Sequence, residues 1–233
     1  MLEAIYDHTV HPRYLRAQSH VLDLGANYGR FAQAITARFG CRCTAVEPSP
    51  GPFAAIAESP LIAKVQAAAA ATSGTLPFHI AVDSIASSLS PPETVVDVID
   101  VHALSLPELF DLVGARPLDL LKMDIEGAEI ELLDTCPASI LHQIRQITVE
   151  FHDHNGITPA SEVSATLARL HKLGFFSVRM SRHGHHDTWI INRNLCDIST
   201  VELKFLEHVA PTWMGIKRVA RRNLKRFTAP KLP

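Results

Sequence analysis

The sequence predicts a doubly wound α/β domain, in which helices cover both faces of one mostly parallel sheet. Two observations carry this prediction. Short apolar segments alternate with segments of helical periodicity along most of the 233 residues, which is the pattern of repeated β–α–β units. Near the end of the chain, two strand-like segments flank a short polar loop, so an antiparallel pair is expected at the edge of the sheet.

The first β–α–β unit is the most regular. The segment "HVLDLG" (20–25) is an apolar run that ends in Asp and Gly, and "CRCTAVEP" (41–48) is a second strand. Between them, residues 28–40 place their large apolar side chains on one helical face, and Gly40 stands where a helix C-cap is expected. A strand, a helix and a second strand in this order begin a parallel sheet.

The middle of the chain has weaker signals. An alanine-rich stretch after "PSPGP" is expected to be helical through Ala71, with a break at Pro60. Strands are expected at 76–82 and 95–101, separated by a polar loop at 84–94. This loop has no periodicity, so it is a candidate lid.

The last part of the chain alternates regularly again. The expected elements are a helix at 105–113, a strand at 118–124, a helix at 127–136, a strand at 144–152, a helix at 161–174, and a hairpin that joins 175–180 to 187–193. The last 40 residues are expected to be helical. Together these elements complete one sheet with helices on both faces.

Composition limits the function classes. Apolar residues make up 47% and charged residues 20%, which suits one folded domain with a full core. No apolar stretch reaches the length of about 18 residues that a membrane span needs, and the N-terminus lacks the apolar region of a secretory signal. The protein is therefore expected to be cytoplasmic. Its four cysteines (Cys41, Cys43, Cys136 and Cys196) lack zinc-site spacing and are expected to be reduced.

Charge is distributed unevenly. From His208 to Pro233 there are seven Lys or Arg residues and no acid, whereas the rest of the chain has a net charge of −9. A basic end on an acidic body suits an anionic membrane, a nucleic acid or another acidic partner. A solvated terminal helix without a partner is the alternative reading.

A ligand is expected at the carboxyl ends of the first two strands, where doubly wound sheets bind their ligands. The loop "DLGANYG" carries Gly25 and Gly29, which permit a tight turn and close approach of the backbone. Glu47 follows the second strand, 24 positions beyond Asp23, where an acid suits two ribose hydroxyls. The loop lacks the G-x-G-x-x-G series, so S-adenosylmethionine (SAM), which carries ribose without phosphate, fits better than NAD.

Further ionisable residues follow two later strands. Asp124 and Glu126 follow the strand at 118–124, and Glu150, His152 and Asp153 follow the next one. These strand ends are expected to be neighbours, because a right-handed crossover joins them. A buried charge is costly unless it is paired or hydrogen-bonded. The five groups are therefore expected at a polar cleft rather than in the core.

Four segments, in this order and at these distances, resemble the FkbM family of SAM-dependent methyltransferases. They are "VLDLGANYGRF", "AVEPSP", "LLKMDIEGAEIELL" and "ITVEFHDH", within roughly residues 18–193. The most specific part, "KMDIEGAE", resembles the family signature K-x-D-x-E-G-x-E. The resemblance implies a class I methyltransferase fold with a seven-stranded, mostly parallel sheet and an antiparallel last strand. It also implies methylation of hydroxyl groups on sugars, glycolipids or natural products.

The resemblance also assigns residues to the cofactor. It places the glycine-bearing loop around the methionine part of SAM, Glu47 at the ribose, and Asp124 at the site of methyl transfer. The cofactor-binding residues that it implies are Asp23, Gly25, Ala26, Asn27, Gly29, Glu47, Pro48, Ser49, Asp83 and Asp124. The chain departs from the family at "ALSLPEL", where many members carry an acid and this chain has Ser105.

These signals divide the chain into three parts. We expect an N-terminal helical or lid segment at 1–17, a SAM-binding domain at 18–195, and a basic helical extension at 196–233. Within the domain, Glu129 and Glu131 are expected to be surface charges on a helix.

Methyl transfer to a hydroxyl requires alignment of the acceptor and removal of its proton. His152 is the first candidate for the base, because its reference pKa lies near working pH. Asp124 and Glu126 are the other catalytic candidates, as groups that orient the histidine or act directly. A divalent metal on Asp124, Glu150 and Asp153 is an alternative way to activate the hydroxyl. The "HGHH" cluster lacks a second pair of zinc ligands and is expected to decorate the hairpin loop.

Three functions compete. The first is O-methylation of a sugar, glycolipid or natural product, with the basic end near anionic membrane. The second is methylation of nucleic acid through the basic end, which the absence of an N-P-P-[FY] motif disfavours. The third is SAM binding without catalysis, which the intact loop, Glu47 and the acidic signature disfavour.

Overall fold

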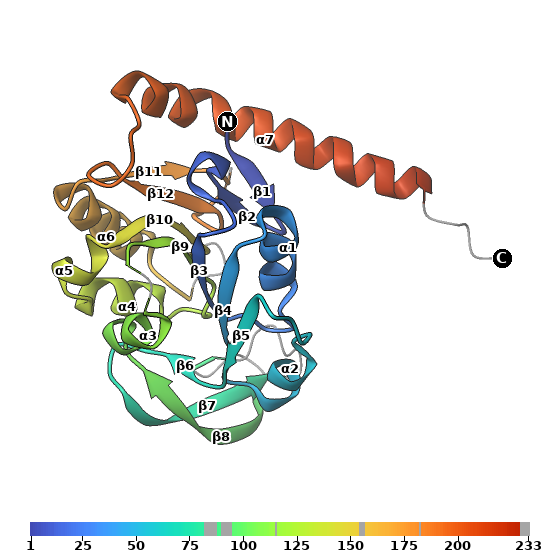
Figure 1. The fold of residues 1–233 in the computed structure, drawn as a ribbon, viewed down its shortest axis with the longest axis vertical. Helices are drawn as coiled ribbons and strands as arrows, with labels where there is room; N and C mark the ends of the chain where they lie inside the picture. Colours follow the sequence, from blue (N-terminus) through green and yellow to red (C-terminus); the bar gives the residue numbers. More distant parts are fainter. Residues whose placement is uncertain (82–87, 90–94, 115, 154–156, 182, 229–233) are drawn as a thin grey trace.

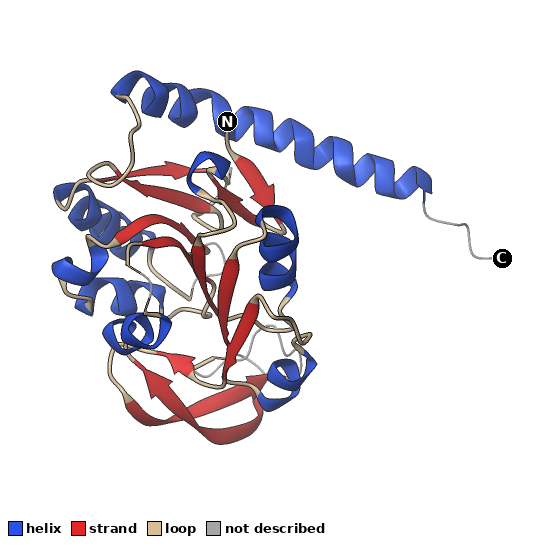
Figure 2. Ribbon diagram, in the orientation of Figure 1, coloured by secondary structure: helices blue, strands red, loops and turns tan. Residues whose placement is uncertain are grey.

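The computed structural model describes residues 1–233 except 82–87, 90–94, 115, 154–156, 182 and 229–233. Its centre is a seven-stranded sheet with helices on both faces (Figures 1 and 2). In spatial order, the strands are β11 (Phe175–Arg179), β12 (Thr188–Asn192), β10 (Ile144–Val149), β9 (Leu118–Met123), β3 (His20–Leu24), β4 (Arg42–Val46) and β5 (Ile62–Val65). Only β12 runs against its neighbours. The predicted sheet with an antiparallel last strand is confirmed.

The strands sort their side chains onto two cores by simple alternation. In β3, Val21 contacts one core and Leu22 and Leu24 contact the other. Helix α1 (Arg30–Phe39) covers the Val21 face. The helices on the other face are α3 (Leu106–Val113), α4 (Glu129–Thr135), α5 (Ala138–Leu141) and α6 (Ala160–Lys172). Asp23 therefore shares the α1 face, although the strand around it is apolar.

Local signals fix the helix ends, and the C-cap predicted at Gly40 is confirmed. Helix α1 ends at Gly40, which adopts the left-handed conformation with φ of 66°. Helix α3 begins with a capping box, in which the side chains of Ser105 and Glu108 bond each other's backbone N–H groups. In this chain, Ser105 therefore serves as the helix cap at the position where the family resemblance led us to look for an acid.

The structure contradicts the helix predicted for the alanine-rich stretch that ends at Ala71. Only α2 (Pro50–Ala55) is helical, and the predicted helix is replaced by the edge strand β5 and the short β6 (Ala68–Ala69). The alanines at 67–70 are at most 5% exposed, so their small side chains are packed in the protein interior. Tertiary packing of this kind overrides the helical propensity of alanine.

The strands predicted near 76–82 and 95–101 exist but belong to another sheet. β7 (Gly74–Ala81) and β8 (Val95–Leu104) pair antiparallel, and β6 completes this three-stranded sheet. The first half of β8 is largely exposed, and a strand inside a parallel sheet must be buried on both faces. The seventh strand of the main sheet is instead β5. Of the predicted loop at 84–94, the structure describes only Ser88 and Leu89.

The N-terminal segment, predicted to be helical or a lid, is a second correction, because it is mainly a hairpin of two strands. β1 (Glu3–Ile5) and β2 (His8–Val10) form a hairpin around the two-residue turn of Tyr6 and Asp7, and the 3-10 helix η1 (Pro12–Tyr14) follows. All three residues of β2 are buried. Thr9 donates hydrogen bonds to the carboxylate of Asp187 from its backbone N–H (3.1 Å) and its hydroxyl (2.7 Å). These contacts fix the hairpin against the end of β12.

The C-terminal region is helical as predicted. Helix α7 (Thr200–Thr228) packs the first part of its length on the β11–β12 edge, and the rest extends past the body of the protein (Figure 1). Within the described residues, no helix combines the length and apolar character that crossing a membrane requires. The four cysteines are buried free thiols, as predicted.

Candidate functional site

Four adjacent strand ends assemble the candidate site. β10, β9, β3 and β4 are neighbours and run parallel, so their carboxyl ends lie at one edge of the sheet. Asp23 lies in β3, Glu47 directly follows β4, Asp124 follows β9 and Glu150 follows β10. This is the edge at which doubly wound sheets bind ligands.

The loop after β3 requires glycine for a steric reason. Gly25 has φ of 70°, and a Cβ at this position would lie 1.8 Å from the carbonyl oxygen of Asp124. The N–H groups of Gly25 and Ala26 both donate to the carbonyl of Val46, at 3.1 and 3.0 Å. The loop is therefore held between β4 and β9. At the other end of this loop, Gly29 also adopts the left-handed backbone conformation and forms the N-cap of α1.

Glu47 is built into this loop by backbone hydrogen bonds. Its carboxylate accepts from the N–H of Asn27 and from the N–H of Ser49, each at 2.8 Å. The residue is 5% exposed. Burial raises the pKa of Glu47, and the hydrogen bonds from Ser49 and Asn27 act in the opposite direction. The carboxylate retains lone pairs for a ligand on the side that faces the cavity described next.

A pocket open to solvent, with about 560 Å³ of empty space including that solvent, lies beside Glu47, and we call it the Glu47 cavity. Its lining residues are Gly25, Asn27, Glu47, Pro48, Ser49, Ala68, Ala69, Phe78, Leu89, Asp124, Ile125 and Glu126. One wall is apolar and includes the buried alanines of β6. Asn27 adds Oδ1, a buried oxygen with no hydrogen-bond partner among the described residues. An apolar slot with an acid and an orphaned amide oxygen fits an adenosine group.

Asp23 and Lys122 form a buried ion pair that the sequence reading did not foresee. They are direct partners in the β3–β9 register, and Nζ of Lys122 lies 3.1 Å from Oδ1 of Asp23. The ammonium also donates to the carbonyls of Gly25 (2.8 Å) and Leu24 (3.2 Å). Asp23 is fully buried and is not among the residues that line the Glu47 cavity. The structure pairs Asp23 with Lys122, and the cofactor contact predicted for Asp23 stays a prediction. The sequence signal for this ion pair was the lysine inside the apolar run "LLKMD".

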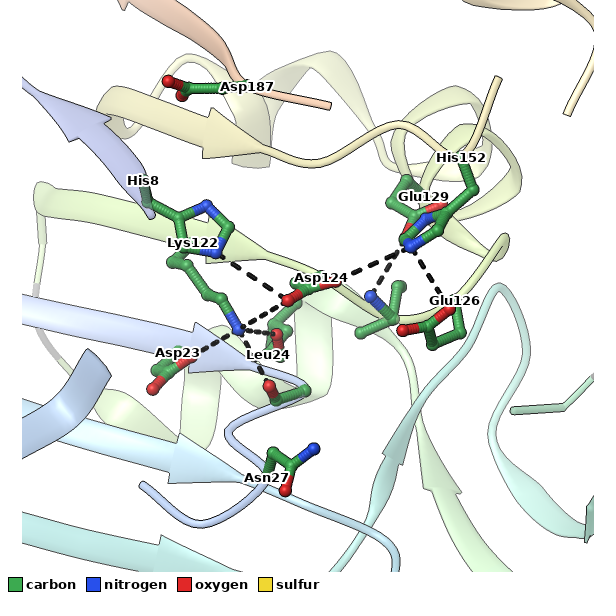
Figure 3. A network of polar contacts seen from close by, with 12 residues as sticks. His8, Asp23, Leu24, Asn27, Lys122, Asp124, Glu126, Glu129, His152 and Asp187 are labelled. Carbon is green, nitrogen blue, oxygen red and sulfur yellow. Dashed lines mark hydrogen bonds and ion pairs between the residues drawn. The ribbon is translucent and has the colours of Figure 1, made fainter. Parts of the chain in front are cut away.

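Asp124 is surrounded by three cationic or potentially cationic groups (Figure 3). Its Oδ2 lies 3.8 Å from Nζ of Lys122 and 3.8 Å from Nε2 of His8, and its Oδ1 lies 3.8 Å from Nε2 of His152. Burial alone would raise the pKa of Asp124, but Lys122, His8 and His152 together hold it well below its ordinary value. His8 comes from β2, in the segment predicted to be helical.

His152 is clamped between two glutamates. Its Nδ1 lies 3.1 Å from Oε1 of Glu129, and its Nε2 lies 3.2 Å from Oε2 of Glu126. Burial lowers the pKa of His152, but the hydrogen bonds to Glu126 and Glu129 outweigh it and raise this pKa to about 11. Glu129 is fully buried and also accepts from the N–H groups of Ile125 and Gly127. The expectation that Glu129 is a surface charge was wrong.

A second pocket open to solvent, with about 830 Å³ of empty space including that solvent, also contacts Asp124, and we call it the Glu150 cavity. Its lining residues are Tyr6, Asp7, His8, Gly25, Ala26, Asn27, Tyr28, Arg30, Phe31, Lys122, Asp124 and Glu150. The Glu150 side chain has no hydrogen bond or ion pair with any residue that the structure describes. Burial, followed by the charge of Asp124, raises the pKa of Glu150 to about 7.

The predicted metal set of Asp124, Glu150 and Asp153 does not assemble. Asp153 instead accepts from the backbone N–H of His185 and pairs with its Nδ1, both at 2.7 Å. Ligand atoms of His8, Asp124 and Glu150 do lie within 4.8 Å of one another, but Nζ of Lys122 contacts the same Asp124 carboxylate and already supplies positive charge. Asp83, the predicted adenine contact, lies outside the described residues.

The sheet order, the antiparallel last strand and a site at these strand ends define the class I methyltransferase fold. The chain belongs to the FkbM methyltransferase family: the methyltransferase FkbM domain matches residues 23–189. This is a family of SAM-dependent methyltransferases. No curated protein matches the chain.

A solved structure of the family supports this fold. The FkbM methyltransferase from Methylobacillus flagellatus KT is 10% identical with a TM-score of 0.51, and the match covers 76% of this chain and 44% of that one. The chain thus spans less than half the length of this relative. M. capricolum TrmK, solved with S-adenosylhomocysteine, is 9% identical with a TM-score of 0.43, over 96% of this chain and 89% of that one.

Proposed function

We propose that this protein is a SAM-dependent O-methyltransferase whose acceptor is a hydroxylated small molecule such as a sugar, a glycolipid or a natural product. One observation carries the proposal. The Glu47 cavity and the Glu150 cavity meet at Gly25, Asn27 and Asp124. A cofactor and an acceptor bound in these two cavities would face each other across Asp124.

The Glu47 cavity supplies what SAM requires. Its apolar wall, which includes Ala68, Ala69 and Phe78, would receive the adenine, and Glu47 would accept hydrogen bonds from the ribose hydroxyls. Bound SAM supplies a methyl group already activated on a sulfonium. Asp124, held ionised by Lys122, places a negative charge near that cationic centre. The neutral amide of Asn27 offers its orphaned Oδ1 to a donor such as an amino group.

The Glu150 cavity supplies an acceptor site and a proton acceptor. Tyr6 and Tyr28 expose aromatic faces there, at 51% and 40% exposure, which suits a sugar ring that combines an apolar face with polar edges. Transfer would form an O–C bond while the S–C bond to the methyl group breaks and S-adenosylhomocysteine leaves. The acceptor O–H bond would also break, so its proton needs a base. Glu150 is that base in our proposal, because it is a partly buried acid of this cavity without a hydrogen bond or ion pair among the described residues, whereas Asp7, the other such acid, is exposed.

His152 does not suit the role that the sequence suggested for it. An imidazole between two carboxylates holds both of its protons at neutral pH, and the pKa of about 11 leaves it without a lone pair to accept another. We propose instead that the cationic His152 positions Glu126 and Asp124 at the rim where the two cavities meet.

Calorimetric titration of the full chain with SAM tests the cofactor assignment. Micromolar binding of SAM and no binding of NAD are expected. Glu47→Gln should weaken SAM binding by about 10- to 100-fold, because hydrogen bonds to a charged acceptor are lost. Glu58→Gln, which removes an exposed carboxylate, is the matched control and should change nothing. A folded native protein that binds NAD, or a folded Glu47→Gln variant that binds SAM as tightly as the native protein does, would contradict the proposal.

A further inference from the structure

We propose that α7 is a docking helix for the surface of an anionic lipid bilayer. The assignment concerns a helix that lines neither of the two cavities, and it stands independently of the methyl transfer proposed above. It rests on three properties of this helix: a face that is anchored, a second face that is apolar and exposed, and a basic end.

One face of α7 is anchored to the body. Leu203, Leu206, Ala210 and Met214 are each at most 5% exposed. They pack in one core with Val178, Trp189 and other residues of β11 and β12. This spacing of three and four residues is the buried stripe of an amphipathic helix, and it fixes the rotation of α7 about its axis.

A second side of α7 carries large apolar side chains in a row. Val201, Phe205, Val209 and Trp213 follow at intervals of four residues, and they are 79%, 53%, 42% and 45% exposed. Because residues four apart lie one above another on a helix, these side chains form a continuous strip, which we call the outer strip. A solvated helix needs polar residues at such positions.

Charge distinguishes the bilayer from other occupants. The segment from His208 onward has seven Lys or Arg residues and no acid, and each cation near an anionic bilayer contributes attraction. Apolar side chains that insert between headgroups, together with a basic segment, are the combination found in interfacial helices. A nucleic acid would use the cations but has no use for the outer strip. A second copy of α7 would bring the two sets of cations together.

The position of α7 suits this role. Its C-terminal half extends past the body of the protein (Figure 1), so a flat surface can approach the basic end of the helix without meeting the rest of the domain. The long stems of Lys and Arg also allow apolar side chains to insert while the charges stay at the headgroups.

Trp213 provides a direct optical test. The chain has two tryptophans, and Trp189 is fully buried. With vesicles of phosphatidylcholine and phosphatidylglycerol, the emission of the full chain should shift to shorter wavelength and the protein should sediment with the vesicles. With pure phosphatidylcholine, binding should be at least about tenfold weaker.

Two pairs of variants make the test specific. Phe205→Ser with Val209→Ser should abolish the emission shift while the unfolding midpoint stays near that of the native protein. Arg221→Gln with Arg222→Gln should weaken vesicle binding by about 10- to 30-fold, whereas Arg16→Gln with Arg179→Gln, which removes two exposed charges from the body, should not. Unchanged emission with anionic vesicles would overturn the proposal. Vesicle binding that persists in both α7 variants would also overturn it. A dimer or an RNA complex that depends on α7, in a protein that does not bind vesicles, would do the same.

Discussion

The two cavities that Asp124 lines are built in different ways. The Glu47 cavity is shaped largely by backbone: Gly25 lies against the Asp124 carbonyl, and two N–H groups orient Glu47. The Glu150 cavity is shaped by side chains that come from distant parts of the chain, including Tyr6 and His8 of the N-terminal hairpin. In our proposal, the first cavity binds a cofactor common to the family and the second binds an acceptor.

This difference indicates where specificity resides. Backbone geometry tolerates few substitutions, so a site made from it suits a ligand that does not change. Side chains on a hairpin and a loop vary at little cost to the fold, so they suit an acceptor that differs between proteins. If this view is right, substitutions in the Glu47 cavity should affect SAM binding and stability, and substitutions in the Glu150 cavity should affect turnover.

The largest effect is expected for Gly25→Ala. The new Cβ would lie 1.8 Å from the Asp124 carbonyl oxygen at a backbone φ of 70°. The left-handed conformation costs about 1–2 kcal/mol for a residue with a side chain, and overpacking adds about 1–3 kcal/mol. Urea unfolding should show the summed loss, and calorimetry should show no SAM binding.

Gly51→Ala is the matched control for this substitution. Gly51 lies in helix α2, and no atom is found within 4 Å of the position of an added Cβ. Alanine is favoured over glycine in a helix, so stability should stay equal or rise slightly and SAM binding should be kept. Gly25→Ala protein that binds SAM with native affinity would show that the loop is not formed by close packing on Asp124.

Glu150→Gln tests the second cavity. Loss of a general base typically lowers the rate by about 10²- to 10⁴-fold, so turnover should fall by this amount with an acceptor that the native protein methylates, while SAM binding is unchanged. Because the pKa of Glu150 is raised to about 7, the carboxylate form increases with pH, and kcat/KM of the native protein should rise through about pH 7. The variant should lack this rise. Equal turnover and an unaltered pH profile in Glu150→Gln would exclude Glu150 as the base.

The same contrast explains what the sequence could predict. The strands around Asp23, Glu47 and Asp124 have strong local signals, and they were placed correctly in the sheet. The alanines at 67–70 were misassigned because only tertiary packing explains them. His8 and Glu129 were missed because their role depends on contacts with Asp124 and His152, which are far from them in sequence. No local periodicity records such contacts.

His152→Gln tests whether the His152 imidazole, which lies between Glu126 and Glu129, is a cation. Removing one partner of a buried pair costs about 3 kcal/mol or more, because Glu126 and Glu129 remain without it. The folded-state pKa of about 11 exceeds the ordinary value of 6.5, so the stabilisation is complete below about pH 6.5 and is lost as pH rises toward 11. Urea unfolding of the native protein should therefore show lower stability at pH 9.5 than at pH 6.5, and the variant should show a smaller change. His208→Gln, at an exposed histidine, should leave both values as they are. Native-like stability of His152→Gln at pH 6.5 would mean that the clamp is neutral, and His152 would again be available as a base.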